Sequence, residues 1–64
     1  MIRVNGEDQT FVNESVHQLL QRLSIEPRGV AVAINGEVVR RSDWSATYVA
    51  DDSAIEIVTA VAGG

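Results

Sequence analysis

Two Asn-Gly pairs, Asn5-Gly6 and Asn35-Gly36, constrain the fold of this 64-residue chain more than any other feature. Both residues of such a pair tolerate positive φ, so Asn-Gly is typical of the two-residue turn of a β-hairpin. Ile2 and Val4 alternate with polar residues before the first pair, and an apolar run at 30–34 precedes the second. Both patterns are those of strands. The sequence therefore predicts two hairpins, one near its start and one in its middle.

A short amphipathic helix is predicted between the two hairpins. Ser15 and Gln18 have the spacing of a capping box, in which each side chain satisfies an orphan amide at the helix start. Apolar residues then recur on one helical face, at Val16, Leu19, Leu20 and Leu23. Pro27 cannot continue a helix, so the chain is expected to turn between Ser24 and Arg28. A helix of about nine residues is marginal alone in water, so its leucine face must pack onto a sheet.

The order of these elements predicts an α+β fold. Strands are expected at 2–5, 9–12, 30–34, 37–41 and 55–59, with Phe11 pointing inward, and Trp44 and Tyr48 covering the core at a sheet edge. Two hairpins that flank one helix fit a single mixed sheet of four to five strands, covered on one face by the helix. This is the β-grasp, or ubiquitin-like, architecture. Residues 1–59 are expected to form the domain, and residues 60–64 a flexible C-terminal tail.

Composition excludes several classes of function. The net charge of −4 disfavours nucleic acid and anionic membrane surfaces as partners. The chain has no cysteine and one histidine, so it can form no disulfide, offers no thiol nucleophile and cannot build a structural zinc site. It has neither a signal peptide pattern nor a membrane-spanning stretch, and the cytoplasm is the expected location.

Candidate chemical groups inside the domain are few. His17 falls on the polar side of the helix and is predicted to be a solvated surface histidine. The acidic pairs Glu7-Asp8 and Asp51-Asp52 lie beside predicted turns, where carboxylates are common, and they lack further metal ligands. Arg40-Arg41 is interpreted as a solvated strand end. No catalytic residue and no metal ligand is predicted.

The C-terminal tail carries the stronger signal. It consists only of Ala, Val and Gly, and ends in Gly63-Gly64. Five extended residues reach about 17 Å, and glycine can pass through a narrow enzyme tunnel because it has no Cβ. The free carboxylate is ionised at neutral pH and is a poor electrophile. Conversion to an acyl adenylate would allow a sulfur nucleophile to attack, and the product would be a thiocarboxylate at Gly64.

The run from Gly29 to Trp44 resembles the central signature of the thiamine-pathway sulfur carriers, the ThiS family. The run from Ile55 to Gly64 resembles the C-terminal signature of that family, and the opening Val4-Asn5-Gly6-Glu7 also fits. The sequence differs from the common pattern at Ser24, where a helix-ending glycine is more usual. It also has a shorter segment before the helix and Asp51-Asp52-Ser53 in place of an Asp-Gly-Asp turn.

The resemblance implies a carrier without catalytic activity or a cofactor of its own. A ThiF-like adenylyltransferase, which binds ATP and magnesium, would adenylate Gly64. A cysteine desulfurase or a related donor would supply sulfur, and thiazole synthase (ThiG) would receive it. Residues Ala62, Gly63 and Gly64 would thread into the partner's active site.

Three other functions remain open at this point. The chain could carry sulfur for another pathway, such as molybdopterin, cysteine or a secondary metabolite. It could modify proteins covalently like ubiquitin, although the absence of lysine excludes lysine-linked chains of itself. It could also be a β-grasp binding module.

Overall fold

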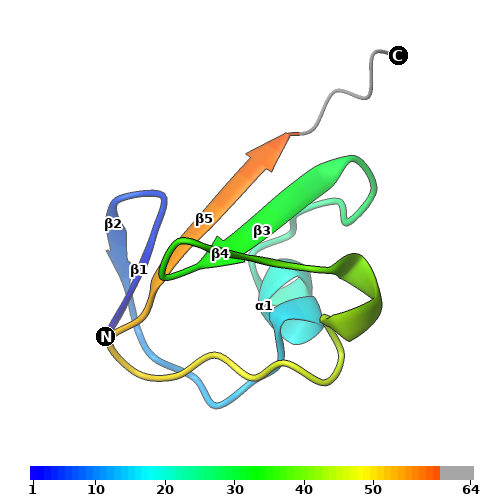
Figure 1. The fold of residues 1–64 in the computed structure, drawn as a ribbon. Coiled ribbons are helices and arrows are strands. Elements are labelled where there is room, and N and C mark those ends of the chain that lie inside the picture. Colours follow the sequence, from blue (N-terminus) through cyan, green and yellow to red (C-terminus); the bar gives the residue numbers. More distant parts are fainter. Residues whose placement is uncertain (60–64) are drawn as a thin grey trace.

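A computed structural model describes residues 1–59 of the chain (Figure 1). The strands are β1 (Ile2–Val4), β2 (Glu7–Gln9), β3 (Val30–Ile34), β4 (Glu37–Val39) and β5 (Ala54–Thr59). The helices are α1 (Val16–Arg22) and the short 3-10 helix η1 (Arg41–Asp43). The order strand, strand, helix, strand, strand, strand is the predicted one.

The strands form one mixed sheet in the order β2-β1-β5-β3-β4. β1 and β5 run parallel, whereas the pairs β1·β2, β3·β4 and β3·β5 are antiparallel. The last strand of the sequence therefore lies at the centre of the sheet, between the two hairpins, and α1 lies on one face (Figure 1). The predicted mixed sheet with a single covering helix, the β-grasp arrangement, is confirmed.

Both Asn-Gly pairs form the predicted two-residue turns. Asn5 and Gly6 have φ of 50° and 84°, and Asn35 and Gly36 have φ of 50° and 86°. Two successive residues at positive φ are the mark of a type I′ turn, whose twist matches that of the flanking strands.

The helix begins as predicted and ends without the usual glycine. The Ser15 hydroxyl accepts a hydrogen bond from the Gln18 N–H (3.2 Å), and the Gln18 side chain accepts one from the Ser15 N–H (3.0 Å). At the other end, the Ile25 N–H donates to the Leu20 carbonyl (2.9 Å) and the Ser24 N–H to the Gln21 carbonyl (3.1 Å). These bonds form a Schellman motif, with Ser24 at φ of 58° in the position that glycine usually takes.

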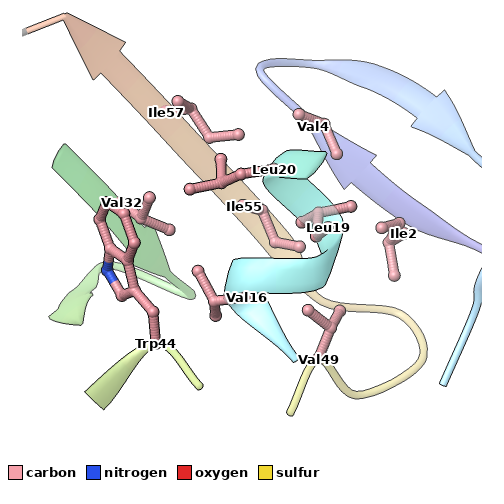
Figure 2. Close-up of a cluster of buried hydrophobic side chains, with 10 residues drawn as sticks. All are labelled: Ile2, Val4, Val16, Leu19, Leu20, Val32, Trp44, Val49, Ile55 and Ile57. Atoms are coloured by element: carbon pink, nitrogen blue, oxygen red, sulfur yellow. The ribbon is translucent and has the colours of Figure 1, made fainter. Parts of the chain in front are cut away.

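The core lies between α1 and the sheet (Figure 2). Its buried members are Ile2, Val4, Val16, Leu19, Leu20, Val32, Trp44, Val49, Ile55 and Ile57. Leu23 is half-buried and packs against this cluster. The apolar face predicted for the helix therefore provides three fully buried residues and one at the margin.

Both returning strands are shorter than predicted. The second strand was expected at 9–12, but β2 occupies Glu7–Gln9, because the two-residue turn makes Glu7 pair directly with Val4. β2 is a polar edge strand, so hydrophobic alternation does not reveal it. Phe11 lies beyond this strand and packs half-buried against the core. β4 ends at Val39 rather than at Arg41, which begins η1.

The prediction for Tyr48 is wrong, whereas Trp44 does enter the core. Trp44 is only 3% exposed, and its indole N–H donates to the Val39 carbonyl (3.0 Å). Tyr48 is 58% exposed, and its backbone forms an isolated bridge to Ser15. Because neighbouring residues of an extended segment point in opposite directions, burial of Val49 turns Tyr48 outward.

Candidate functional site at the end of strand β5

The predicted site residues Ala62, Gly63 and Gly64 lie outside the described residues, as does the whole predicted tail at 60–64. The candidate site is therefore built from the strand that leads to them. β5 ends at Thr59, at the point where the described chain stops (Figure 1).

Strand β5 is held on both edges. Ile55 pairs with Val4 of β1 on one side, and Ala31 of β3 pairs with Val58 on the other. The side chains of Ile55 and Ile57 are buried on the α1 side (Figure 2). Because side chains alternate along a strand, Glu56 and Val58 project from the opposite face of the sheet.

Two asparagine side chains bind the backbone of β5, one toward each end. The Asn5 side-chain amide donates to the Ile57 carbonyl (3.0 Å), and the Ile57 N–H donates to Asn5 Oδ1 (2.8 Å). The Ala54 N–H donates to Asn35 Oδ1 (2.9 Å), and the Asn35 N–H donates to the Ala54 carbonyl (2.8 Å). The Asn-Gly pattern predicted only the turns, and not these contacts with β5. The signal in the sequence that could have indicated these contacts is the use of Asn rather than Asp or Gly at both turns. Of these three residues, only Asn has a side chain with both a hydrogen-bond donor and an acceptor at neutral pH.

The sheet face opposite α1 carries a shallow apolar depression of about 190 Å³. The depression is lined by Ala31, Val32, Ala33, Val38, Glu56 and Val58. We call these residues, without the buried core residue Val32, the exposed face. Val38 is 75% exposed and Val58 is 58% exposed. Val58 directly precedes Thr59, so this face continues to the point where β5 ends. Glu56 places a carboxylate within the apolar surface.

The other residues considered in the sequence are His17, Arg40 and Arg41. His17, predicted to be a solvated surface histidine, lies half-buried near the start of α1, and its backbone N–H donates to the Trp44 carbonyl (3.3 Å). Arg40 and Arg41 are exposed, as predicted. Within residues 1–59, no three histidine, cysteine, aspartate or glutamate side chains gather as metal ligands. The same part of the chain contains no helix of the length and apolarity needed to cross a membrane.

Asp51 binds the ammonium group of Met1. The Met1 nitrogen lies 2.6 Å from Asp51 Oδ1 and 3.9 Å from an oxygen of Asp52. The hydrogen bond from the Met1 ammonium lowers the pKa of the Asp51 carboxyl, and the same bond raises the pKa of the Met1 ammonium. Asp52 also lines a hollow of about 370 Å³ with Arg3, Asp8 and Ala54. Ala54 begins β5, so this hollow lies at the end of the strand remote from Thr59.

One buried charge has no clear signal in the sequence. Glu14 is only 6% exposed and binds Arg22, at the end of α1, through both carboxylate oxygens. This pair joins the segment before the helix to the last turn of the helix, and it does not contact the end of β5.

Comparison with known proteins identifies the family. The sequence model of the ThiS family matches residues 2–64. The chain belongs to the ThiS family. The match extends from the first strand through the glycine pair, so the resemblance inferred from residues 29–44 and 55–64 is confirmed.

Two solved structures and several sequences are similar to this ThiS-family chain. The crystal structure of a thiamine biosynthesis protein (ThiS) from Geobacter metallireducens has a TM-score of 0.85 and 34% identity, covering 98% of this chain and 97% of that one. An NMR structure of a thiamine biosynthesis protein from the same organism has a TM-score of 0.77 and the same identity, covering 98% of this chain and 86% of that one. The β-grasp fold is therefore shared along nearly the whole length.

The sequence relatives include carriers and an enzyme. The sulfur carrier protein ThiS of Escherichia coli is 36% identical over 56 residues, which are 88% of this chain and 85% of that protein. The sulfur carrier protein ThiS of Thermus thermophilus is 27% identical over the full length of both chains. A thiazole synthase of Paramagnetospirillum magneticum is 37% identical over 62 residues, which are 95% of this chain but only 19% of the enzyme.

Proposed function

We propose that this chain is a sulfur carrier of thiamine biosynthesis whose working group is the carboxylate of Gly64. The observation that carries the proposal is the family match through Gly64, on a domain whose central strand leads into the Gly-Gly segment. The relatives from E. coli and T. thermophilus are sulfur carrier proteins by name. The chain is a carrier rather than a catalyst, so the enzymes that act on it supply the catalytic groups.

The chemistry takes place at the carbonyl carbon of Gly64. A ThiF-like adenylyltransferase, with ATP and magnesium bound to it, joins a carboxylate oxygen of Gly64 to the α-phosphate of ATP and releases pyrophosphate. A sulfide ion, or the terminal sulfur of a persulfide on a cysteine desulfurase or related donor, then attacks the carbonyl carbon. The C–S bond forms while the C–O bond to AMP breaks, and AMP leaves with the bonding electron pair. Sulfide gives the thiocarboxylate directly, whereas a persulfide gives an acyl disulfide whose S–S bond is then cleaved by a thiol acting as reductant. Ala62 and Gly63 would allow Gly64 to enter a narrow active site of the partner, since glycine has no Cβ and alanine has only a methyl side chain.

Thiazole synthase is the proposed acceptor of the sulfur. The support is the similarity of this chain to a segment of the P. magneticum thiazole synthase, which places a related domain in the same polypeptide as that enzyme. We propose a cytoplasmic location, because the reaction needs ATP and a sulfur donor.

The exposed face is the proposed contact surface for the adenylyltransferase. Val38 and Val58 are apolar and largely exposed, and Val58 lies one residue before the end of β5. A partner that binds this face would hold the end of β5 at a defined position relative to its own active site. Glu56 favours a partner with a basic side chain opposite the apolar depression.

The test is the intact mass of the carrier after incubation with a ThiF-like adenylyltransferase, ATP, magnesium and a sulfide source. We expect the gain that corresponds to one oxygen replaced by sulfur. The gain should be absent without ATP and absent from a variant lacking Gly64. No gain with an enzyme that demonstrably activates another carrier would refute the proposal.

Pathway assignment needs a second step. The thiocarboxylated chain should support thiazole formation by thiazole synthase in the presence of the other substrates of that enzyme. Failure there, combined with successful thiocarboxylation, would assign the chain to another sulfur pathway.

A further inference from the structure

The pairing of β1 with β5 is completed by a side chain. The backbone register of these strands covers Arg3↔Ala54 and Val4↔Ile55, and the Asn5 N–H donates to the Ile55 carbonyl (2.9 Å). The chain then turns away at Gly6. The Asn5 side-chain amide supplies the next donor and acceptor, and both bind Ile57. A primary amide offers the same hydrogen-bonding groups as a peptide unit, so Asn5 extends β1 along β5 without further backbone.

The backbone N–H and C=O groups of successive β5 residues point alternately toward β1 and toward β3. The bonds made by Asn5 therefore affect how the end of the strand is held. The backbone groups of Ile57 face Asn5, so those of Val58 face β3, where Val58 pairs with Ala31. The backbone groups of Thr59 face the β1 side again. Within residues 1–59, the two bonds at Ile57 are the last that the β1 hairpin makes to β5, two residues before Thr59.

We infer that Asn5 is a positioning residue for the reaction at Gly64, an inference that rests on the proposed function. Its two side-chain bonds secure the β1 edge of β5 at Ile57, while β3 pairs with the other edge as far as Thr59. Asn5 therefore helps to fix the strand end to which residues 60–64 are attached. A carrier whose β5 end has opened does not fit the adenylyltransferase. The apparent affinity then falls in proportion to the competent fraction. KM for the carrier should rise, whereas kcat should stay unchanged.

The second Asn-Gly turn provides a matched control. Asn35 has the same φ of 50° as Asn5, precedes a glycine in the same type of turn and also binds β5. Its bond is to Ala54, at the end of β5 remote from Gly64. The substitutions Asn5→Gly and Asn35→Gly both keep a residue that accepts positive φ, and both remove the side-chain bonds to β5. They differ in which end of β5 is released.

The experiment combines amide hydrogen exchange with steady-state kinetics of carrier adenylation, at a temperature where all variants are folded by circular dichroism. In Asn5→Gly, exchange at Ile57 and Val58 should accelerate by between about fivefold and 25-fold, since two hydrogen bonds are lost and each net bond shifts a local equilibrium roughly fivefold. KM for the carrier should rise at constant kcat, by no more than the factor by which opening increases. In Asn35→Gly, exchange should accelerate at Ala54, and KM should change less than about twofold. Equal KM values for the two variants, or a change in kcat alone, would overturn the inference.

A conservative variant covers the case in which Asn5→Gly does not fold. Asn5→Asp keeps the acceptor for the Ile57 N–H and loses the donor to the Ile57 carbonyl. Exchange and KM should both exceed those of wild type, because a carboxylate oxygen then faces the Ile57 carbonyl. Wild-type values for both would overturn the inference. If wild type itself is not adenylated, the proposed function fails, and unchanged exchange at Ile57 in the Asn5 variants would separately remove the positioning role.

Discussion

Glu14, just before α1, and Arg22, in the last turn of α1, form a bidentate ion pair. Arg22 Nε lies 2.9 and 3.2 Å from the two carboxylate oxygens of Glu14, and Nη2 lies 2.8 Å from one of them. The Glu14 side chain is 8% exposed and that of Arg22 is 33% exposed. The carbonyl of Glu14 also accepts from the Val49 N–H (3.0 Å). Glu14 therefore connects three separate segments of the chain, two of them through the ion pair and the third through its backbone carbonyl.

Loss of Arg22 should destabilise the fold because it leaves the Glu14 carboxylate buried without its partner. We expect Arg22→Gln to lower the free energy of unfolding by about 1–3 kcal/mol, less than for a fully buried pair because Arg22 retains contact with water. Arg28→Gln is the control, because Arg28 is 83% exposed and lies 3.9 Å from Glu26. That change should stay within about 0.5 kcal/mol. Urea unfolding of both variants measures the difference, and equal effects would contradict this account.

Ser24→Gly should stabilise the protein. Ser24 occupies the left-handed conformation at the end of α1, where a Cβ costs energy that glycine avoids. We expect a gain of about 0.5–1 kcal/mol after the larger backbone entropy of glycine in the unfolded chain is included. Ser42→Gly in η1 is the counterpart at a position without positive φ and should be destabilising. Thermal unfolding reports both changes, and a stabilisation shared by the two variants would argue against the conformational explanation.

The contact between Met1 and Asp51 should contribute to stability over a limited pH range. The pKa of Asp51 is lowered from 3.8 by its hydrogen bond with the ammonium, so its contribution is present above 3.8 and is lost as the pH falls through the folded-state pKa. The pKa of the Met1 ammonium is raised from 8.0, so its contribution is present below 8.0 and is lost as the pH rises through the folded-state pKa.

Asp51→Asn removes both contributions. The stability difference between wild type and this variant should be largest between about pH 4 and pH 8 and should vanish at both extremes. The effect should be small because both groups are exposed. Asp52→Asn, whose carboxylate lies 3.9 Å from the ammonium, should leave the pH profile nearly unchanged. Urea midpoints across the pH range provide the measurement, and a difference independent of pH would show that the charge contact is not responsible.

Replacement of the exposed valines should weaken activation without unfolding the domain. Val38→Thr and Val58→Thr keep the β-branched shape but add a hydroxyl group to the exposed face. We expect the KM of the adenylyltransferase for the carrier to rise severalfold for the double variant, with thermal stability nearly unchanged. Val12→Thr is the control, because Val12 is 38% exposed and lies in the segment between β2 and α1. Equal KM values for these proteins would exclude the exposed face from the contact.

Short-range signals in the sequence determined most of the secondary structure. The positive φ of Asn5 and Asn35, the capping box at Ser15 and the apolar helical face depend on residues within four positions of one another, where spacing and side-chain chemistry decide the outcome. The second strand was predicted at 9–12 rather than at Glu7–Gln9, because the polar residues of this edge strand become a strand only through pairing with β1. The glycine pair and the signature runs also identified the family from the sequence alone.

The tertiary structure decided relationships between residues that lie far apart in the chain. It placed β5 between two hairpins, gave the inward position to Val49 rather than Tyr48, and brought the Asn5 side chain to Ile57 across 52 positions. Local sequence patterns cannot predict such long-range contacts. Each contact depends on which buried surfaces and unpaired backbone groups remain once the whole core has assembled.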